Sequence, residues 1–278
     1  MGNIIAFHTG ALGKYPAVEA IRRIAAAGYG GVELNAETLP WARPHVTPAT
    51  PAAERRAIRE AAAKAGVAIT AVSAHIGLVY ADPAERRAAV AFSKGCVDLA
   101  LDLGTDVIHG LTGVVPAGVP REEAWDWALA AVAEIADYAA SRGVRFGIEP
   151  VVGMLVANGS ALGRLVAALP GHRVGMNYDP SHLLVEGEDP AEVARRFADL
   201  IVAVHLKDAK GTPDHFEFPP LGMGGVDFAA LAAALRAAGY AGPLAVEYEA
   251  QAFGGYDLSE DEILGQSLAF VRQHFAGE

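Results

Sequence analysis

Residues 174–208 read VGMNYDPSHLLVEGEDPAEVARRFADLIVAVHLKD, and this stretch decides the fold class. It contains two short apolar runs of strand length, Val174 to Asp179 and Ile201 to Asp208. Between them lies Ala191 to Asp199, whose apolar residues recur with helical spacing. A strand, a helix and a second strand in this order form a βαβ unit, in which the two strands pair in parallel. The stretch therefore predicts an α/β protein built on a parallel sheet.

The same alternation recurs along the whole chain, and it yields eight strand-like runs. They are Asn3 to Thr9, Gly31 to Ala36, Ala68 to His75, Thr105 to Leu111, Arg145 to Pro150, Val174 to Asp179, Ile201 to Asp208 and Leu244 to Glu249. Helical segments include Ala52 to Ala65, Ala84 to Leu103, Glu122 to Ser141, Ala191 to Asp199 and Phe228 to Ala238. Eight βα units in about 250 residues are typical of a (β/α)8 TIM barrel. We expect one such domain over residues 1–278.

Glycines support the same count, because Gly28, Gly66, Gly104, Gly143 and Gly239 each stand just before a predicted strand, where a helix C-cap falls. The 278 residues, of which 52% are hydrophobic, suffice for one large core.

Charge and cysteine content limit the partners and the compartment. The formal net charge of −11 disfavours nucleic acid and anionic membranes as partners. No apolar run approaches the ~20 residues that span a bilayer, and no basic region precedes the first apolar residues. Cys96 has no second cysteine with which to form an internal disulfide. These features predict a cytoplasmic protein with no membrane or nucleic-acid partner.

Four consecutive strands end in side chains that are unusual for a barrel strand. These residues are Glu149, Asp179, His205 and Glu247. Carboxylates and an imidazole at the C-terminal mouth of a barrel would repel one another or lack partners unless a cation or protons intervened. Each could instead be an ordinary cap or ion pair, but four in series favour a divalent metal site. Oxygen and nitrogen ligands of this kind accept Mn, Mg, Co or Zn, and Glu249 is a competing ligand because it shares a strand face with Glu247.

At this point the sequence resembles the sugar phosphate isomerase/epimerase family, the xylose isomerase-like barrels that include ketose 3-epimerases and inosose dehydratase. The resemblance covers nearly the whole chain. Its most specific parts are Asp179-Pro-Ser-His182, His205-Leu-Lys-Asp208, and Leu221-Gly-Met-Gly-Gly-Val-Asp227-Phe, which leads through Gly239-Tyr-Ala-Gly-Pro to Glu247. The metal ligands that the resemblance implies are Glu149, Asp179, His205 and Glu247, the same four residues.

The resemblance also implies a reaction, which is proton transfer at the carbon next to a carbonyl of a small carbohydrate. A metal would bind the carbonyl and hydroxyl oxygens and stabilise an enediolate, while Glu149 and Glu247 would act as acid and base. His182 would contact a substrate oxygen, or else cap the turn after Asp179. Lys207 would polarise an oxygen and Asp208 would orient its neighbours, or both could form a structural ion pair.

Other polar strand ends and three loops complete the candidate site. Glu33, His75 and His109 would line the substrate pocket, whereas His8 is either a substrate contact or a buried, hydrogen-bonded imidazole. Residues 37–50, 209–225 and 250–258 are typical of lids over a barrel mouth. Their aromatic residues, Trp41, Phe253 and Tyr256, would cover a sugar face or form contacts in a homo-oligomer. No Gly-rich phosphate cradle is evident, which disfavours a phosphorylated substrate.

Three other functions remain open. A dehydratase or lyase would use the same enediolate chemistry. A non-catalytic sugar-binding or assembly subunit could retain the barrel. A multi-metal abasic-site endonuclease would use a similar ligand set. However, that family places an Asp-x-His close before its Gly-rich loop, and here Asp214-His215 lies further upstream.

Overall fold

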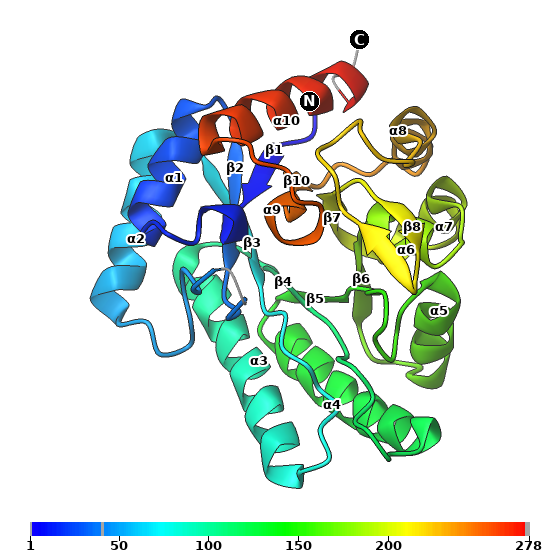
Figure 1. Cartoon of the computed structure of the whole chain (residues 1–278). Helices are drawn as coiled ribbons and strands as arrows, with labels where there is room; N and C mark the ends of the chain where they lie inside the picture. The colour runs from blue at the N-terminus through cyan, green and yellow to red at the C-terminus, as the bar shows by residue number, and fades with distance from the viewer. Residues whose placement is uncertain (1, 40–41, 276–278) are drawn as a thin grey trace.

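The computed structural model describes residues 2–39 and 42–275. Its centre is a closed barrel of parallel strands in the order β1-β10-β7-β6-β5-β4-β3-β2, which confirms the predicted TIM barrel (Figure 1). The barrel strands are β1 (Ile5–His8), β2 (Gly31–Asn35), β3 (Ala68–Ser73), β4 (Val107–Gly110), β5 (Arg145–Ile148), β6 (Val174–Tyr178), β7 (Ile201–Leu206) and β10 (Leu244–Val246). Every predicted strand is therefore present, though shorter than its apolar run.

Helices surround the barrel, as the sequence predicts, except for the short α9 (Ala250–Phe253), which lies near the strand ends at the centre of the view (Figure 1). They are α1 (Ala17–Ala26), α2 (Ala52–Ala65), α3 (Pro83–Leu103), α4 (Arg121–Ser141), α5 (Gly159–Ala168), α6 (Pro180–Val185), α7 (Pro190–Arg196), α8 (Phe228–Ala237), α9 (Ala250–Phe253) and α10 (Glu260–Phe275). The segment predicted as Ala191 to Asp199 ends earlier, at Arg196, and a 3-10 turn, Ala198–Leu200, follows it.

The predicted glycine caps lie where the helices turn into strands. Gly66 and Gly104 adopt φ angles of 74° and 87°, and the N–H of each donates back to carbonyls in the last turn of its helix. Gly28, Gly143 and Gly239 also have positive φ angles. The left-handed backbone stops each helix without the steric cost that a β-carbon would bring.

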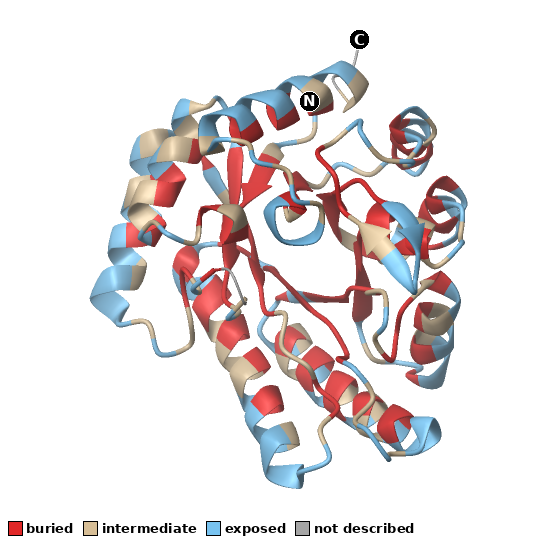
Figure 2. Cartoon of the chain, viewed as in Figure 1, coloured by how far each residue is buried: buried red, intermediate tan, exposed pale blue. Residues whose placement is uncertain are grey.

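The barrel interior and the inner faces of the helices are buried, while the outer helix faces are exposed (Figure 2). Two glycines make close packing within the barrel possible. A β-carbon on Gly147 or Gly175 would lie only 2.7 or 2.5 Å from a methyl group of Val202. These glycines on β5 and β6 therefore leave room for the valine side chain of β7, below the polar strand ends.

Two of the three predicted lid segments contain short elements of their own. Residues 209–225 include an antiparallel hairpin of β8 (Lys210–Thr212) and β9 (His215–Glu217), and residues 250–258 begin with α9. Neither element is predicted by the sequence pattern. Over the described residues, no helix is both long and apolar enough to cross a membrane.

Candidate metal centre and substrate pocket

The four predicted metal ligands meet at the carboxyl ends of the barrel strands. Glu149 and Glu247 directly follow β5 and β10, Asp179 directly follows β6, and His205 is the penultimate residue of β7. One ligand atom from each lies within 4.8 Å of the corresponding atoms of the other three. All four residues are buried. The chain thus brings the four side chains of the predicted quartet into one cluster.

The position of Asp179 follows from its second task, which is to cap α6. Its Oδ1 accepts hydrogen bonds from the Ser181 backbone N–H, at 2.8 Å, and from the Ser181 hydroxyl, at 2.7 Å. Oδ2 is left to face the cluster, 3.0 Å from the Lys207 ammonium nitrogen. Capping at an N-terminus fixes a carboxylate without consuming both of its oxygens.

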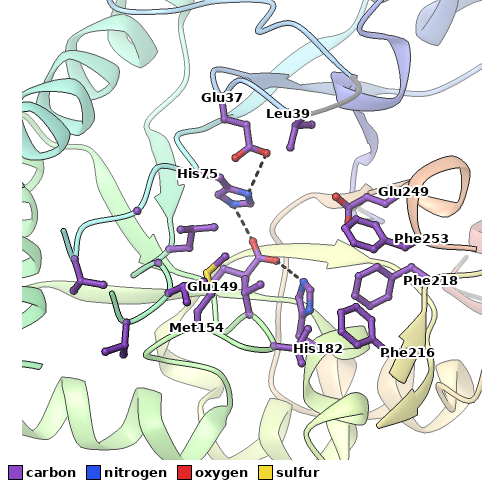
Figure 3. Close-up of a pocket in the computed structure, with 18 of the residues that line it drawn as sticks. Glu37, Leu39, His75, Glu149, Met154, His182, Phe216, Phe218, Glu249 and Phe253 are labelled. Atoms are coloured by element: carbon purple, nitrogen blue, oxygen red, sulfur yellow. Dashed lines mark ion pairs between the residues drawn. The ribbon is translucent and has the colours of Figure 1, made fainter. Parts of the chain in front are cut away.

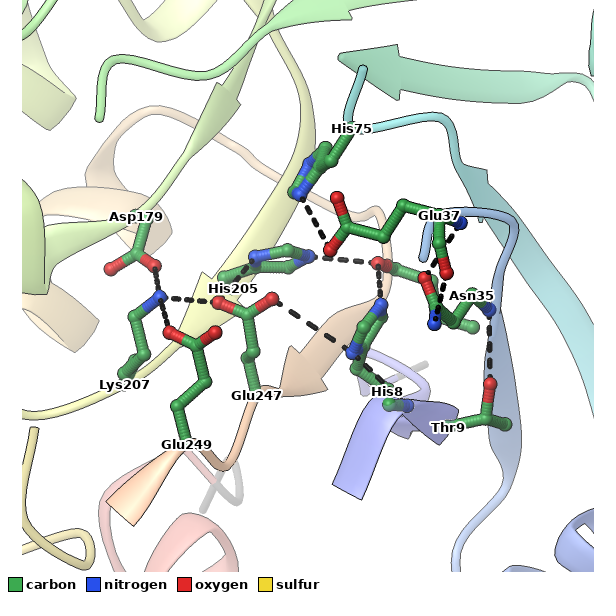
Figure 4. A network of polar contacts seen from close by, with 12 residues as sticks. His8, Thr9, Asn35, Glu37, His75, Asp179, His205, Lys207, Glu247 and Glu249 are labelled. Atoms are coloured by element: carbon green, nitrogen blue, oxygen red, sulfur yellow. Dashed lines mark hydrogen bonds and ion pairs between the residues drawn. The ribbon is translucent and has the colours of Figure 1, made fainter. Parts of the chain in front are cut away.

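Glu33 on β2 fixes the orientation of His205. Glu33 Oε1 lies 2.8 Å from His205 Nε2, so Nε2 carries the hydrogen and donates it. The other ring nitrogen, Nδ1, lies 3.4 Å from a Glu247 oxygen and 3.7 Å from a Glu149 oxygen. Figure 4 shows His205 and Glu247 side by side in this network. Such separations suit ligands of a shared cation, and a carboxylate behind a metal-binding histidine is a common arrangement.

The electrostatics of the cluster require positive charge. Burial disfavours ionisation of Glu149, but attraction to His75 and His205 outweighs it and holds the pKa of Glu149 well below its ordinary value. Burial likewise opposes ionisation of Glu247, and Lys207 and His205 lower its pKa further than burial raises it. Burial would lower the pKa of His205, but attraction to Glu247, Glu33 and Glu149 outweighs it and raises the pKa well above the ordinary value. The negative charge around the ring therefore favours a proton or a metal ion on Nδ1.

Lys207 lies on the same inward face as His205 and contacts several acidic groups. Its ammonium nitrogen lies 3.0 Å from Glu249 Oε2 and also bonds Glu247 Oε2. His182 Nε2 lies 3.2 Å from it. Burial and the Lys207 charge lower the pKa of His182 to about 4, so its ring is neutral and accepts from the ammonium. Glu249, the competing ligand, pairs with Lys207 and does not belong to the cluster of four.

Asp208 binds the backbone of the loop that follows β7. Its two oxygens accept backbone N–H groups of Ala209, Gly222, Gly224 and Val226 at 2.8 to 3.1 Å. A β-carbon on Gly224 would lie 2.1 Å from Asp208 Oδ1, so only glycine fits there. Asp208 forms no ion pair among the described residues. These hydrogen bonds hold the start and the end of the 209–225 loop next to β7.

A second group of polar residues lies beside the cluster. His75 Nε2 is 2.8 Å from His109 Nδ1 and 3.0 Å from Glu149 Oε2. His109 Nε2 in turn lies 3.0 Å from Glu33 Oε1. His75, His109 and Glu149 also present ligand atoms within 4.8 Å of one another. Burial would lower the pKa of His75, but attraction to Glu149 and Glu37 outweighs this effect and raises the pKa to about 9.

A cavity of about 750 Å³ opens above these residues (Figure 3). Of the predicted substrate-binding residues, His75, His182 and Lys207 line it, together with Glu149, Glu247 and Glu249. Glu33 and His109, also predicted to line the pocket, are not among the described residues that line the cavity. Both are buried, and they lie inside strands instead of after them, so their side chains form a layer below the cavity.

His8 has the environment of a buried, hydrogen-bonded imidazole. Its Nδ1 accepts the Gly10 N–H at 3.3 Å, its Nε2 lies 3.9 Å from Glu33, and it is not among the described lining residues. Burial lowers its pKa to about 4. This environment is the buried, hydrogen-bonded one of the two sequence alternatives.

Loop aromatics were predicted to cover a sugar face. Phe253 lines the cavity, Tyr256 does not appear among the described lining residues, and Trp41 lies outside the described part of the chain. Phe216 and Phe218, on and beside β9, line the cavity next to Phe253 and form ring contacts with it at centroid distances of 6.2 and 5.4 Å. Their alternation in Phe-Glu-Phe was an available signal, because residues two apart in a strand share a face.

Two further residues at the site were not predicted from the sequence. Glu37 lines the cavity, 3.8 Å from His75 Nδ1, and burial raises its pKa to about 8. Asn177 donates from Nδ2 to Glu149 Oε2. Because Asn177 precedes Asp179 by two residues, strand alternation places both on the inward face and could have identified it.

The closed parallel barrel and the acidic cluster at its mouth define a class of TIM barrel whose mouth is polar and contains a possible metal-binding cluster. Within that class, residues 21–274 match the family model described as Xylose isomerase-like TIM barrel. The chain belongs to this family.

Relatives in the family carry out more than one reaction. The chain is 29% identical over 166 residues to the rhizopine catabolism protein MocC of Rhizobium meliloti, covering 54% of this chain and 50% of the relative. It is 29% identical to inosose dehydratase of Geobacillus thermodenitrificans, covering 46% and 48%. It is 28% identical to L-ribulose 3-epimerase of Mesorhizobium japonicum, covering 68% and 63%. The matched region thus spans about half the length of the first two relatives.

Solved structures agree on the fold. The IOLI protein, whose crystal structure contains a bound zinc atom, superposes with a TM-score of 0.81 over 99% of this chain and 100% of that one, at 17% identity. At this level of identity the likeness establishes the barrel alone.

Proposed function

We propose that this chain is a divalent-metal-dependent isomerase or epimerase of small carbohydrates or keto-polyols, acting by proton transfer at the carbon next to a carbonyl. The observation that carries the proposal is the cluster of Glu149, Asp179, His205 and Glu247 at the polar end of the cavity, in which both glutamates also line the cavity wall. Epimerase relatives support the same reaction class.

The donor set fits a divalent cation. The cluster holds three buried carboxylates, and Lys207 is the one lysine or arginine that contacts it among the described residues. Glu149, Asp179, His205 and Glu247 would hold the ion, with His205 binding through Nδ1. The oxygen-rich set suits Mn, Mg, Co or Zn, and a relative with bound zinc supports the last of these. When bound, the cation would polarise the carbonyl and stabilise the negative charge of the enediolate.

The residues of the chain would divide the proton transfers between them. One of the two glutamates, Glu149 or Glu247, removes the proton from the carbon as a carboxylate. The other, protonated in the reactive complex, returns its proton to the opposite face for an epimerisation. For an isomerisation the proton is returned to the neighbouring carbon, and the proton of the substrate hydroxyl moves to the former carbonyl oxygen. Lys207 and the neutral His182 contact substrate oxygens, which holds the carbon within reach of the carboxylates. Both groups lie beside a proposed acid-base residue, Lys207 next to Glu247 and His182 3.7 Å from Glu149.

The decisive experiment is hydrogen exchange. The metal-reconstituted protein is incubated in heavy water with a panel of ketoses, aldoses and keto-inositols, and deuterium is sought at the carbon beside the carbonyl. Exchange together with a rearranged sugar supports the proposal. Exchange followed by loss of water identifies a dehydratase, a function that the inosose dehydratase relative favours. Metal-dependent binding of a sugar without any exchange would instead indicate a non-catalytic subunit.

A second possible metal site allows a test of the endonuclease-like alternative. Because His75, His109 and Glu149 could hold another ion, a count of two or three ions per chain would favour the endonuclease-like function, and one ion the isomerase. Asp214 and His215, which would have to complete a third site, are both exposed on the hairpin. This placement favours the isomerase.

We expect Glu33→Gln to weaken cation binding about 10- to 100-fold, because Glu33 holds the His205 ring with Nδ1 toward the cluster and supplies negative charge behind it. Titration of Mn²⁺ into the metal-free protein, followed by calorimetry, measures the change. Glu54→Gln, an exposed residue in the first turn of α2, is the matched control and should bind as the parent does. An unchanged affinity in folded Glu33→Gln would show that the carboxylate does not position His205.

A further inference from the structure

We infer that the substrate is an uncharged α-hydroxycarbonyl compound that carries an apolar substituent, and that one side of the cavity is the binding site for this substituent. The inference rests on the proposed function, which supplies the α-hydroxycarbonyl group. It goes further in naming a second part of the ligand and the surface that receives it.

The surface in question is an apolar wall, and it comes from three neighbouring loops. We define the apolar wall as Val79 and Tyr80 after β3, Val114, Val115 and Pro116 after β4, and Met154 after β5. None of these six residues carries a charge, whereas His75 and Glu149, at the start of two of the same segments, line the polar end. Val114 is 64% exposed, although it faces a cavity, so a large part of its surface has no protein partner. Apolar surface of this kind gains free energy when a ligand covers it.

The apolar wall is held in place by hydrogen bonds between the loops. The N–H groups of Leu78 and Val79 donate to Thr112 O at 2.9 and 3.2 Å, and Leu155 N–H donates to Gly113 O at 2.9 Å. Gly113 has a φ of 87°, and a β-carbon there would lie 2.9 Å from the Gly77 backbone. Two loops therefore approach closely where both residues lack side chains. A surface fixed in advance loses little entropy when it binds a ligand.

The apolar wall and the phenylalanines lie on opposite sides of the polar groups. Strands β3, β4 and β5 are neighbours in the barrel, whereas Phe216, Phe218 and Phe253 belong to the segments after β7 and β10. Figure 3 shows the phenylalanines on one side and Met154 on the other, with Glu149 and His182 between them. A substrate whose reacting carbon meets Glu149 can thus extend an apolar substituent toward the apolar wall, on the side away from the phenylalanines.

The charges in the cavity argue against an anionic substituent. Four acidic side chains line the cavity, those of Glu37, Glu149, Glu247 and Glu249. Among the described lining residues, Lys207 is the only lysine or arginine, and its ammonium group is already paired with Asp179, Glu247 and Glu249. His75, the other candidate for positive charge, lies against Glu149 and Glu37. The proposed cation would take the α-hydroxycarbonyl oxygens at the polar end. A phosphate or carboxylate on a substituent that extends away from that end would find no unpaired lysine or arginine among the described lining residues.

The size of the cavity is consistent with a two-part ligand. A cavity of about 150 Å³ suffices for a benzene ring, and this one measures about 750 Å³. A six-membered ring at the polar end leaves room for a substituent of similar size along the apolar wall.

A homologous series of minimal substrates tests the inference. Hydroxyacetone, 1-hydroxy-2-butanone, 1-hydroxy-2-hexanone and 2-hydroxyacetophenone share the α-hydroxyketone group and differ in the apolar part, and dihydroxyacetone phosphate replaces the apolar part with an anion. Kd is measured by ligand-observed NMR on the Mn²⁺-loaded protein, and deuterium exchange is measured separately. We expect Kd to fall roughly fourfold for each added methylene, and the phosphate to bind more weakly than 1-hydroxy-2-hexanone.

Val114→Asp should flatten this dependence on chain length, because it places a carboxylate in the apolar wall at a side chain exposed enough to tolerate the change. Leu101→Asp is the matched control. Leu101 is 38% exposed on α3, is not among the described lining residues, and should leave the series unaltered.

The two measurements separate this inference from the proposed function. A Kd that is the same along the series, no binding at all, or tight binding of the phosphate would overturn the inference, whatever the exchange result. Binding that strengthens with chain length and weakens in Val114→Asp supports the apolar wall even if no deuterium is incorporated. In that case only the proposed proton transfer would be contradicted.

Discussion

Glu149→Gln and Glu247→Gln should each reduce deuterium exchange at the carbon beside the carbonyl by at least about a thousandfold, a loss at the upper part of the range for removal of a general acid or base. The amide keeps the size and much of the polarity of the side chain but cannot accept and return a proton. Both residues line the cavity, and a positive neighbour lowers the pKa of each, His75 beside Glu149 and Lys207 beside Glu247. The measurement is the exchange rate with the best substrate of the panel.

Each glutamate is also a proposed ligand, so loss of the metal must be separated from loss of the proton carrier. Asp179→Asn provides the comparison, because Asp179 belongs to the cluster but is not among the described residues that line the cavity. At saturating Mn²⁺, Asp179→Asn should recover part of its exchange, whereas the two glutamine variants should not. Full recovery of either glutamine variant at high metal would remove that residue from the acid-base role and leave it a ligand only.

The sequence could predict the barrel because the fold depends on patterns that lie within each βα unit. Apolar runs of strand length, helical spacing and glycine caps are local, and each marks its own element. The hairpin β8–β9 was missed for the same reason. Its strands are three residues each and largely exposed, so they lack the apolar run that identifies a buried strand.

The candidate cluster was also accessible from the sequence, but the depth of each polar residue was not. His8, Glu33, His109 and His205 lie inside strands, and all four are buried below the described lining of the cavity. His75, Glu149, Lys207 and Glu247 follow the last residue of their strands and line it. Because strand ends predicted from sequence are uncertain by a few residues, a shift of one or two positions decides between a substrate contact and the layer that supports the site.

The apolar wall could not be predicted, because valine and proline in a loop have no distinctive meaning on their own. Val114 and Val115 read equally well as packing against a helix, and only the position of three loops in space shows that they face the cavity beside Met154. Acidic residues at strand ends can be recognised from the sequence, because a buried carboxylate needs a positive or hydrogen-bonding partner.

Addition of Mn²⁺ to the metal-free protein should raise its Tm by roughly 5–15 °C, and a chelator should reverse the change. A ligand at 100 to 1,000 times its Kd stabilises the folded state by about 3–4 kcal/mol, and each kcal/mol shifts a protein of this size by a few degrees. The unfolded chain cannot offer the same preformed set, because Asp179 is positioned by the cap of α6 and His205 by Glu33.

A net charge of −11 also attracts cations to the surface, so the control must remove the cluster and leave the surface charge nearly unchanged. Asp179→Asn and Glu192→Gln each remove one negative charge, the first in the cluster and the second on the exposed face of α7. The metal should stabilise Glu192→Gln as it does the parent, and it should stabilise Asp179→Asn much less. If Mn²⁺ raised the Tm of both variants equally, the bound cation would lie outside the cluster. Glu149 and Glu247 would then have no metal beside them to stabilise the enediolate, and their acid-base assignment would be contradicted.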